Sequence, residues 1–481
     1  MMDLNKKLAQ NIKVIEDRFD GDKTFDFTIR EFKIGDKDAA LAFIQGFNKD
    51  EVVNQILAYL MYAKRQDLSV DAIKKVIETR LPVAEADVVE TVDDVVLETL
   101  SGPQVLLIDG EDKAIVIDAR TWEARGPEEP ELEKATRGSE DGFVETMMFN
   151  VQLIRRRIRD ASLRVEALQA GKKANSDLSV IYMKDYADLE LVEEVKERIN
   201  EIDVDGLPLA DRTIEDYLTR DTLNPLPKVR YTNRPDIAAA HILEGKICVV
   251  VDNSPTVLIL PSTFFDQTQN LEEYRQSPVP GTYFNLLRLV AVVIGLVLPP
   301  LWLLIAYGPA WLPEALEFIG PKDPGTVPLG WQFVIATVGI DLIRIASIQT
   351  PTALATSLSL IAALILGEFS VETGLFDPET ILYLAIGAIS NFALPGYELS
   401  LTLSLMRFGL ILLVVFLRAP GLIAGLILIF LLFVLSKSFG TPYLWPLIPF
   451  DWSALKTYLF RQSILSLKDR RRKVPGAKDF E

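Results

Sequence analysis

Apolar residues in the second half of the chain form long runs that few charges interrupt. Each run is near the roughly 17–25 residues that a helix needs to cross a bilayer. Pro299 and Pro300 should kink or break the first run, and Arg407 and Arg418 weaken the last two, so four to six crossings fit the pattern. The six runs are 287–307, 331–348, 352–368, 379–396, 399–417 and 419–437.

The second and third runs carry polar residues at helical spacing. Asp341 and Arg344 lie three residues apart and therefore on one face of a helix. In the third run, small or hydroxyl side chains follow steps of three and four up to an acid. The members of this stripe are Thr352, Thr356, Ser359, Ala363 and Glu368. The pattern by itself favours close helix packing, and the alternative is the lining of a cation pore.

Ionisable residues at membrane depth are costly and commonly mark a functional site. Asp341, Arg344 and Arg407 are expected to form a charged network inside the bundle. Arg407 can pair with Asp341 or Glu398, and such a pair can be purely structural.

The first part of the chain alternates between helix and strand patterns. Two apolar runs flank Asp109-Gly110, a dipeptide suited to positive φ, which predicts a β-hairpin over 105–120. Other expected strands are 25–34, 39–47, 177–183 and 246–251, and expected helices are 3–19, 50–64, 71–80, 188–201 and 235–244. The fold class is a two-part α+β or α/β soluble region followed by a polytopic α-helical transmembrane domain.

Composition shifts suggest where these parts begin and end. A stretch rich in Pro, Gly and charge indicates a linker between two soluble subdomains. The expected order is subdomain I over 1–125, the linker over 126–142, subdomain II over 143–280, the membrane domain over 286–440 and a basic tail over 441–481.

The first helix of subdomain II carries an arginine cluster. Arg155, Arg156 and Arg157 are interface candidates. Clustered guanidinium groups can bind phosphate or carboxylate, but a solvated face or a subunit contact is the commoner role of a charge run.

Charge and residue counts exclude several classes of function. The 481 residues have a net charge of −17, which argues against a nucleic-acid partner. One Cys and one His exclude a disulfide within the chain and most metal sites. Cys248 lies in an apolar run and is expected to be a buried thiol. Phosphate-binding glycine motifs and a nucleophile–base pair are absent, so we expect no enzyme, no cofactor and no metal.

The ends of the chain indicate its orientation. The N-terminus has no apolar signal-peptide core, so the run near 289 should serve as the insertion signal. Basic residues concentrate between 461 and 481, which places the C-terminal tail in the cytoplasm. An even number of spans then puts both termini on that side.

Four blocks of sequence carry a family resemblance. They are EKATRGSEDGFVETMMFNVQLIRRRIRD at 133–160, IDVDGLPLADRTIEDYL at 202–218, NPLPKVRYTNRPDIAAAHILEGKICVVVDNSPTVLILPSTFFD at 224–266, and the helix pair at 330–368. With them the chain resembles the A subunits of GerA-type spore germinant receptors over nearly its whole length.

The resemblance implies a multi-pass protein of the spore inner membrane, with both termini on the core side. It implies a homo-oligomeric ion channel that releases cations during germination, with the N-terminal region as an assembly and coupling module. Implied partners are a transporter-like B subunit, a C lipoprotein or sporulation operon products, and membrane lipid. The resemblance raises the pore interpretation of the 352–368 stripe above packing. A non-conducting scaffold for other germination proteins is the main alternative, and a secondary transporter is a weaker one.

Overall fold

The structure is a computed structural model of the chain. It describes residues 2–20, 23–47, 50–63, 72–79, 81, 86–119, 133, 137–221, 223–308, 319–321, 325–349, 354, 357, 360–361 and 364–461. These residues form two compact units. The first comprises residues up to 221 together with 231–261, and the second comprises 222–230 and 262–461.

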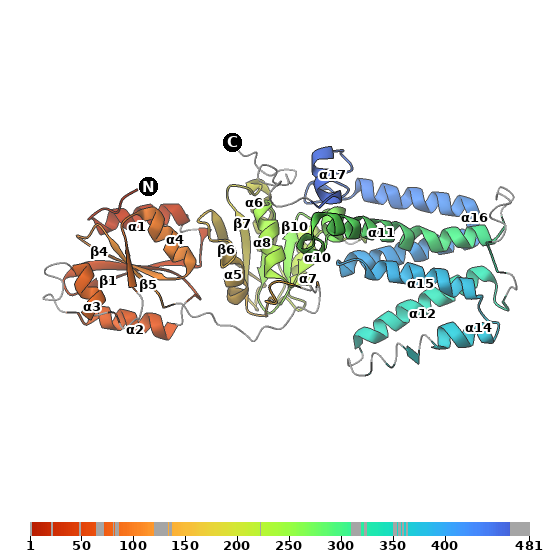
Figure 1. The fold of residues 1–481 in the computed structure, drawn as a ribbon, viewed down its shortest axis with the longest axis horizontal. Helices are drawn as coiled ribbons and strands as arrows, with labels where there is room; N and C mark the ends of the chain where they lie inside the picture. The colour runs from red at the N-terminus through yellow and green to blue at the C-terminus, as the bar shows by residue number, and fades with distance from the viewer. Residues whose placement is uncertain are drawn as a thin grey trace. The chain divides into compact units, whose positions relative to one another are not determined.

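The first sheet of the soluble unit has five strands in the order β1-β2-β4-β5-β3, all paired antiparallel. Helices α1 and α4 cover one face, and α2 and α3 cover the other (Figure 1). Both faces are therefore apolar, since Leu41 packs toward α2 and Ala40 toward α1. The strands are β1 Phe27–Ile34, β2 Lys37–Ile44, β3 Ala86–Val89, β4 Gln104–Ile108 and β5 Ala114–Ile117, and the helices are α1 Leu8–Phe19, α2 Asp50–Met61, α3 Ala72–Thr79 and α4 Val92–Ser101.

The predicted hairpin over 105–120 is confirmed. β4 and β5 pair with Leu106 opposite Ile115. The turn between them contains Gly110 at φ 88°, a conformation that glycine adopts without steric cost.

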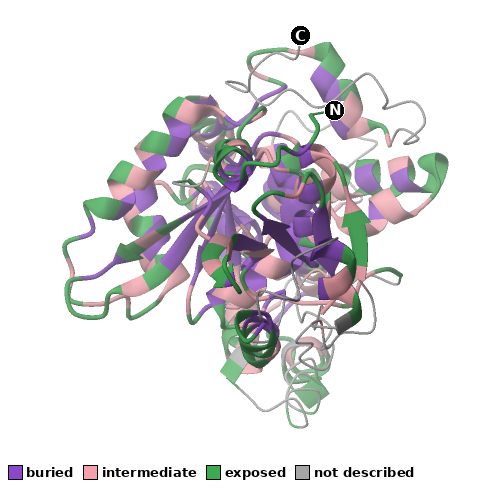
Figure 2. Ribbon diagram, turned by 90° about the vertical axis from the view of Figure 1, so that its left-hand side faces the viewer, coloured by how far each residue is buried: buried purple, intermediate pink, exposed green. Residues whose placement is uncertain are grey.

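The second sheet also has five strands, in the order β6-β7-β9-β10-β8. Helices α5 and α8 pack on β7 and β9, while α6 contacts β6 and α7 contacts β10. Most residues of these five strands are buried. Figure 2 shows buried residues in purple along strands of the structure. The elements are β6 Leu163–Ala170, β7 Ser176–Met183, β8 Arg230–Thr232, β9 Ile247–Val251, β10 Val257–Leu260, α5 Met147–Arg155, α6 Leu189–Asn200, α7 Asp211–Thr219 and α8 Pro235–Leu243. Cys248 lies in β9 and is fully buried, as expected.

The second unit holds the membrane helices. Among the described residues, three helices are long and apolar enough to cross a bilayer: α11 Pro278–Ala306, α12 over Leu329–Ser347 of Leu329–Gln349, and α16 Tyr397–Leu435. Helix α15, Pro378–Phe392, has 15 residues and spans about 22 Å. The sequence predicts a kink or a break at Pro299 and Pro300; helix α11 continues through both prolines, so it is not broken there. The smaller elements are α9 Phe264–Thr268, α10 Leu271–Arg275, the π-helix η4 Leu364–Phe369, α14 Ser370–Glu372, β11 Lys437–Ser438, β12 Thr441–Pro442 and α17 Trp452–Leu459.

The units divide the chain differently from the predicted domain boundaries. Residues 222–230 and 262–280 group with the membrane helices, although they fall inside the expected subdomain II. Part of the expected basic tail forms β12 and α17, because Trp445, Leu455 and Tyr458 are buried in an apolar cluster with Phe265.

Helix α16 is a helical hairpin. Arg418 is its one non-helical residue, with φ 58° and ψ −136°. Beyond it the chain folds back, because a Cβ on Gly425 would lie 2.5 Å from Leu410, and one on Gly421 would lie 2.1 Å from the Leu413 carbonyl oxygen. The two glycines, four residues apart, allow close approach of the arms.

The glycine contact gives a first prediction. G421A should open the hairpin and destabilise the membrane unit by about 1–3 kcal/mol, because the added methyl group meets backbone. G409A is the control, since a Cβ at Gly409 meets nothing within 4 Å. Thermal unfolding of the full-length protein in detergent measures both variants, and equal stability of the two would contradict the close approach.

Candidate functional site

Polar side chains of three membrane helices meet between apolar surfaces. We call the residues involved, Asp341 and Arg344 of α12, Asn391 of α15, and Ser404 and Arg407 of α16, the intramembrane polar cluster. Asn391 Nδ2 donates to Ser404 Oγ at 2.8 Å, and Arg344 Nη1 donates to the same oxygen at 3.1 Å. Ser404 therefore connects α12, α15 and the first arm of α16.

Two glycines make room for Arg407, which is only 1% exposed. Its Nη1 donates to the carbonyl oxygen of Gly295 in α11 at 3.4 Å. A Cβ on Gly387 would lie 3.0 Å from that nitrogen, and one on Gly295 would lie 3.2 Å from Asn391 Oδ1. All four helices thus contribute to the cluster.

The cluster holds two guanidinium groups and one carboxylate. Asp341 Oδ1 lies 3.9 Å from Arg344 Nη1, and the aspartate side chain is 39% exposed. Within the part of the chain that the structure describes, no carboxylate forms a close ion pair with Arg407, although the charge of Asp341 acts on its guanidinium. Arg407 Nε and Arg344 Nη2 are buried without a hydrogen-bond acceptor among the described residues.

The predicted pore stripe is only partly described. Thr352, Thr356, Ser359 and Ala363 lie outside the described residues. Glu368 lies in the π-helix η4, and its side chain is exposed, as are those of Ile365 and Phe369. The stripe as a pore lining stays a prediction.

A second polar group lies where the chain passes between the two units. We call residues 224–230, 262–275, 436–443 and 458–461 the juxtamembrane collar. Ser438 Oγ donates to the Lys228 carbonyl oxygen at 2.6 Å and accepts from Ser262 N at 2.9 Å. Gln267 Nε2 donates to the Val229 carbonyl oxygen at 2.8 Å. These bonds hold the crossing segments to the end of α16.

The collar also contacts the N-terminal half of α11. Arg288 of α11 forms an ion pair with Glu273 of α10 and donates to the carbonyl oxygens of Thr268 (3.1 Å) and Ala393 (2.7 Å). Arg461 Nε donates to the Glu273 carbonyl oxygen at 3.0 Å. The sequence analysis missed this group. The sequence contains one signal of it, a capping box at the start of α9. In this box the Thr263 and Asp266 side chains each accept a hydrogen bond from the other residue's backbone N–H.

Glu273 is the titratable centre of the collar. Its side chain is 4% exposed, and burial raises its pKa to about 7, although the charge of Arg288 partly opposes the rise. An acid whose folded-state pKa exceeds the unfolded value of about 4.3 binds its proton more tightly when folded. Stability from this group is therefore present at low pH and is lost as pH rises toward 7.

The E273Q variant tests this titration. The wild-type protein should lose thermal stability between about pH 5 and pH 7, whereas E273Q should lose less over that interval because its amide does not ionise. Melting temperatures in detergent from pH 5 to pH 8 give the comparison, with E272Q as the neighbouring control. Parallel pH profiles for wild type and E273Q would rule out the raised pKa.

The arginines of the subdomain II cluster lie in different environments. Arg155 is fully buried and forms a bidentate ion pair with Asp26, at 3.1 Å from Nε and 2.9 Å from Nη2. It joins the two sheets of the soluble unit, as does the bridge between Thr24 and Val165. Arg155 is therefore an internal contact and not a surface for a partner, which corrects its prediction as an interface residue.

The two neighbouring arginines remain nearer the surface. Arg157 donates to Ser139 Oγ (2.7 Å) and to Asp141 Oδ2 (3.0 Å), and it is partly exposed. Arg156 is exposed. Their role as interface residues stays a prediction.

R155A should destabilise the soluble unit by about 3–5 kcal/mol, because it leaves the buried Asp26 carboxylate unpaired. The double variant D26A/R155A should recover part of this loss, since it removes both charges. R159A, at an exposed position of the same cluster, is the control. Pulse proteolysis of the full-length protein across a urea series measures the unfolding of this unit. A loss in R155A no larger than in R159A would contradict the internal pair.

Comparison with known proteins settles the family. The sequence profile described as "Bacillus/Clostridium GerA spore germination protein" matches residues 13–473. The chain belongs to this family. The match spans the soluble unit, the collar and all the membrane helices, which confirms the resemblance seen in the four sequence blocks.

Two curated relatives align along nearly the whole chain. Stage V sporulation protein AF of Bacillus subtilis (strain 168) is 40% identical over 453 residues, covering 94% of this chain and 92% of the relative. Spore germination protein KA of the same organism is 29% identical over 464 residues, covering 95% and 85%. Their names are those of sporulation and germination proteins rather than of enzymes.

One solved structure is also similar. The crystal structure of the N-terminal domain of the A subunit of the Bacillus megaterium spore germinant receptor GerK3 is 25% identical, covers 55% of this chain and 97% of that chain, and gives a TM-score of 0.42. Because this score is low, the fold assignment rests on the strands and helices described above.

Proposed function

We propose that this membrane protein is a subunit of a homo-oligomeric ion channel of the germinant-receptor A type, which releases cations during spore germination. The observation that supports it is Asp341, a carboxylate 39% exposed within an apolar span. A charged side chain facing lipid at the centre of a helix costs roughly 2.5–3.5 kcal/mol or more. A water-filled cavity between copies of the chain removes this cost.

The exposure of α12 supports assembly. Only 28% of its apolar window is buried, so most of the helix surface is left for lipid or other protein. Leu342 and Ile345 are 60% and 53% exposed beside Asp341. A carboxylate flanked by exposed apolar residues fits a helix that faces both another copy and water. Glu368, exposed on η4, and the stripe of Thr352, Thr356, Ser359 and Ala363 fit the same cavity.

Family membership supports a proposal for location and partners. We infer that the chain lies in the spore inner membrane with both termini on the core side. In that arrangement it works beside a transporter-like B subunit and a C lipoprotein, or beside other products of its sporulation operon. Several relatives are named spore germination proteins, among them KA, B1 and A1 of Bacillus subtilis.

The collar supports a coupling role for the soluble unit. The chain crosses between the units at residues 221–222, 230–231 and 261–262. The crossing segments are bonded to α11 and α16 through Arg288 and Ser438. A displacement of the soluble unit would therefore reach the helices that hold the intramembrane polar cluster.

Ion flux from liposomes that contain the purified full-length protein tests conduction. D341N and E368Q should change cation flux or cation preference severalfold, because each removes a carboxylate from the proposed cavity. S359L should block flux if the stripe lines the pore. L342A, which alters the exposed neighbour of Asp341, should conduct like wild type.

The alternative is a non-conducting scaffold that docks other germination proteins. It is favoured by an exposed aromatic and apolar patch at the end of α2, where Tyr59, Met61 and Tyr62 are 54%, 54% and 80% exposed. Patches of this kind commonly mark protein contacts. A well-folded oligomer without flux in any variant would reject the channel and leave this function.

A further inference from the structure

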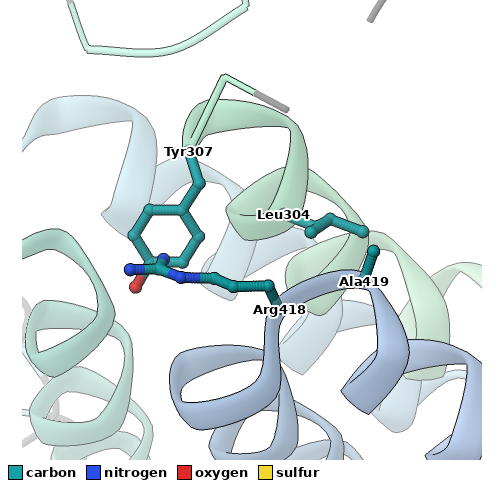
Figure 3. Close-up of a pocket in the computed structure, with 4 residues that line it drawn as sticks. All are labelled: Leu304, Tyr307, Arg418 and Ala419. Carbon is teal, nitrogen blue, oxygen red and sulfur yellow. The ribbon is translucent and has the colours of Figure 1, made fainter. Parts of the chain in front are cut away.

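A cavity of about 280 Å³ lies where α11 ends and α16 turns. It is lined by Leu304 and Tyr307 of the first helix end and by Arg418 and Ala419 of the hairpin turn. The guanidinium carbon of Arg418 is 3.2 Å from the centroid of the Tyr307 ring. In Figure 3 the Arg418 side chain reaches the Tyr307 ring, with Leu304 and Ala419 to the right of the two groups. Stacking fixes the plane of the guanidinium at the mouth of the cavity.

Within the described part of the chain, the donors of Arg418 are available to a ligand. A guanidinium carries five N–H donors in a planar fork that matches phosphate and carboxylate oxygens. Arg418 is exposed, and the structure gives its guanidinium no hydrogen-bond acceptor or carboxylate among the residues that it describes. The Tyr307 ring covers the face of the Arg418 guanidinium. The N–H donors along its edge point away from the ring and can bind an anion.

The strained backbone of Arg418 indicates that the arginine side chain has a role at this turn. Arg418 has φ 58° and ψ −136°, a conformation that glycine tolerates and other residues adopt only at a cost. A glycine would make the same turn without strain. This chain instead has an arginine at the strained turn of α16.

The position of the turn identifies the source of the anion. Arg418 joins two apolar arms in a helix of mean hydropathy 2.5, so the turn lies where the apolar arms end. That level of a bilayer holds the phosphate groups of the lipids, and tyrosine and arginine commonly lie there. Leu304 and Ala419 supply apolar walls for the glycerol and first acyl carbons next to a bound phosphate.

We propose that this cavity binds the phosphate headgroup of a membrane phospholipid, with Arg418 as the phosphate ligand and Tyr307 as the platform that orients it. The bound lipid covers the outer surface of the α11 end and the α16 hairpin turn. The site does not depend on ion conduction, and it gives the chain a fixed lipid position beside its membrane helices.

Native mass spectrometry of the full-length protein tests the site, after delipidation in detergent and titration with phosphatidylglycerol. R418G should weaken retention of the lipid about tenfold or more, because it removes a charge-assisted bidentate contact. Its melting temperature should equal or exceed that of wild type, since glycine relieves the backbone strain. R418K should retain an intermediate affinity. K437A removes an exposed cation at the other end of the second arm and should bind like wild type.

Three outcomes decide the proposal. Loss of lipid in a stable R418G, with retention in K437A, supports it. Equal lipid retention by R418G and wild type overturns it. A titration in which millimolar inorganic phosphate displaces the lipid from wild type as readily as an excess of phosphatidylglycerol does would show a free-phosphate site and overturn the lipid assignment.

Discussion

The cost of placing ionisable groups in hydrocarbon constrains the whole membrane unit. Arg407 is buried against Gly295, and Arg344 is held by Ser404, so both guanidinium groups are enclosed by protein. Asp341, the carboxylate near them among the described residues, is partly exposed. Gly295 of α11 and Gly387 of α15 are needed in this arrangement, because a larger side chain would collide with Asn391 or Arg407. The oligomer that we propose would accommodate Asp341 beside water, whereas a lone subunit would expose this carboxylate to lipid.

We propose that movement of the soluble unit is passed through the collar to these helices. The two five-stranded sheets are joined internally by the buried pair of Arg155 and Asp26, which favours their movement as one body. The segments that leave this unit are then fastened to α11 and α16 by side chains that bond backbone carbonyl groups, such as Gln267 and Arg288. Burial raises the pKa of Glu273 to about 7 inside that attachment, so we expect the attachment to lose stability as the pH rises toward 7.

Local patterns predicted the regular elements well. The Asp109-Gly110 turn, the helices over 188–201 and 235–244 and the strand over 246–251 depend on nearby residues, and the structure contains all of them. Arg155 was harder to predict, because a run of arginines is normally solvated and its partner Asp26 lies 129 residues away. The collar was missed for the same reason, since its bonds connect segments from three distant parts of the chain. Arg418 weakened the prediction of the last span, whereas in the structure it forms the turn between the last two apolar runs.

Thiol labelling in intact vesicles tests most directly whether Asp341 faces water. The single cysteine, Cys248, is fully buried, so a cysteine introduced into α12 can be labelled over little background. With a water-soluble, membrane-impermeant reagent supplied on both sides, D341C is expected to react. L342C, at the neighbouring exposed position that we propose faces lipid, is expected to remain unlabelled. A D341C variant as unreactive as L342C would place Asp341 away from water and contradict the assembled aqueous cavity.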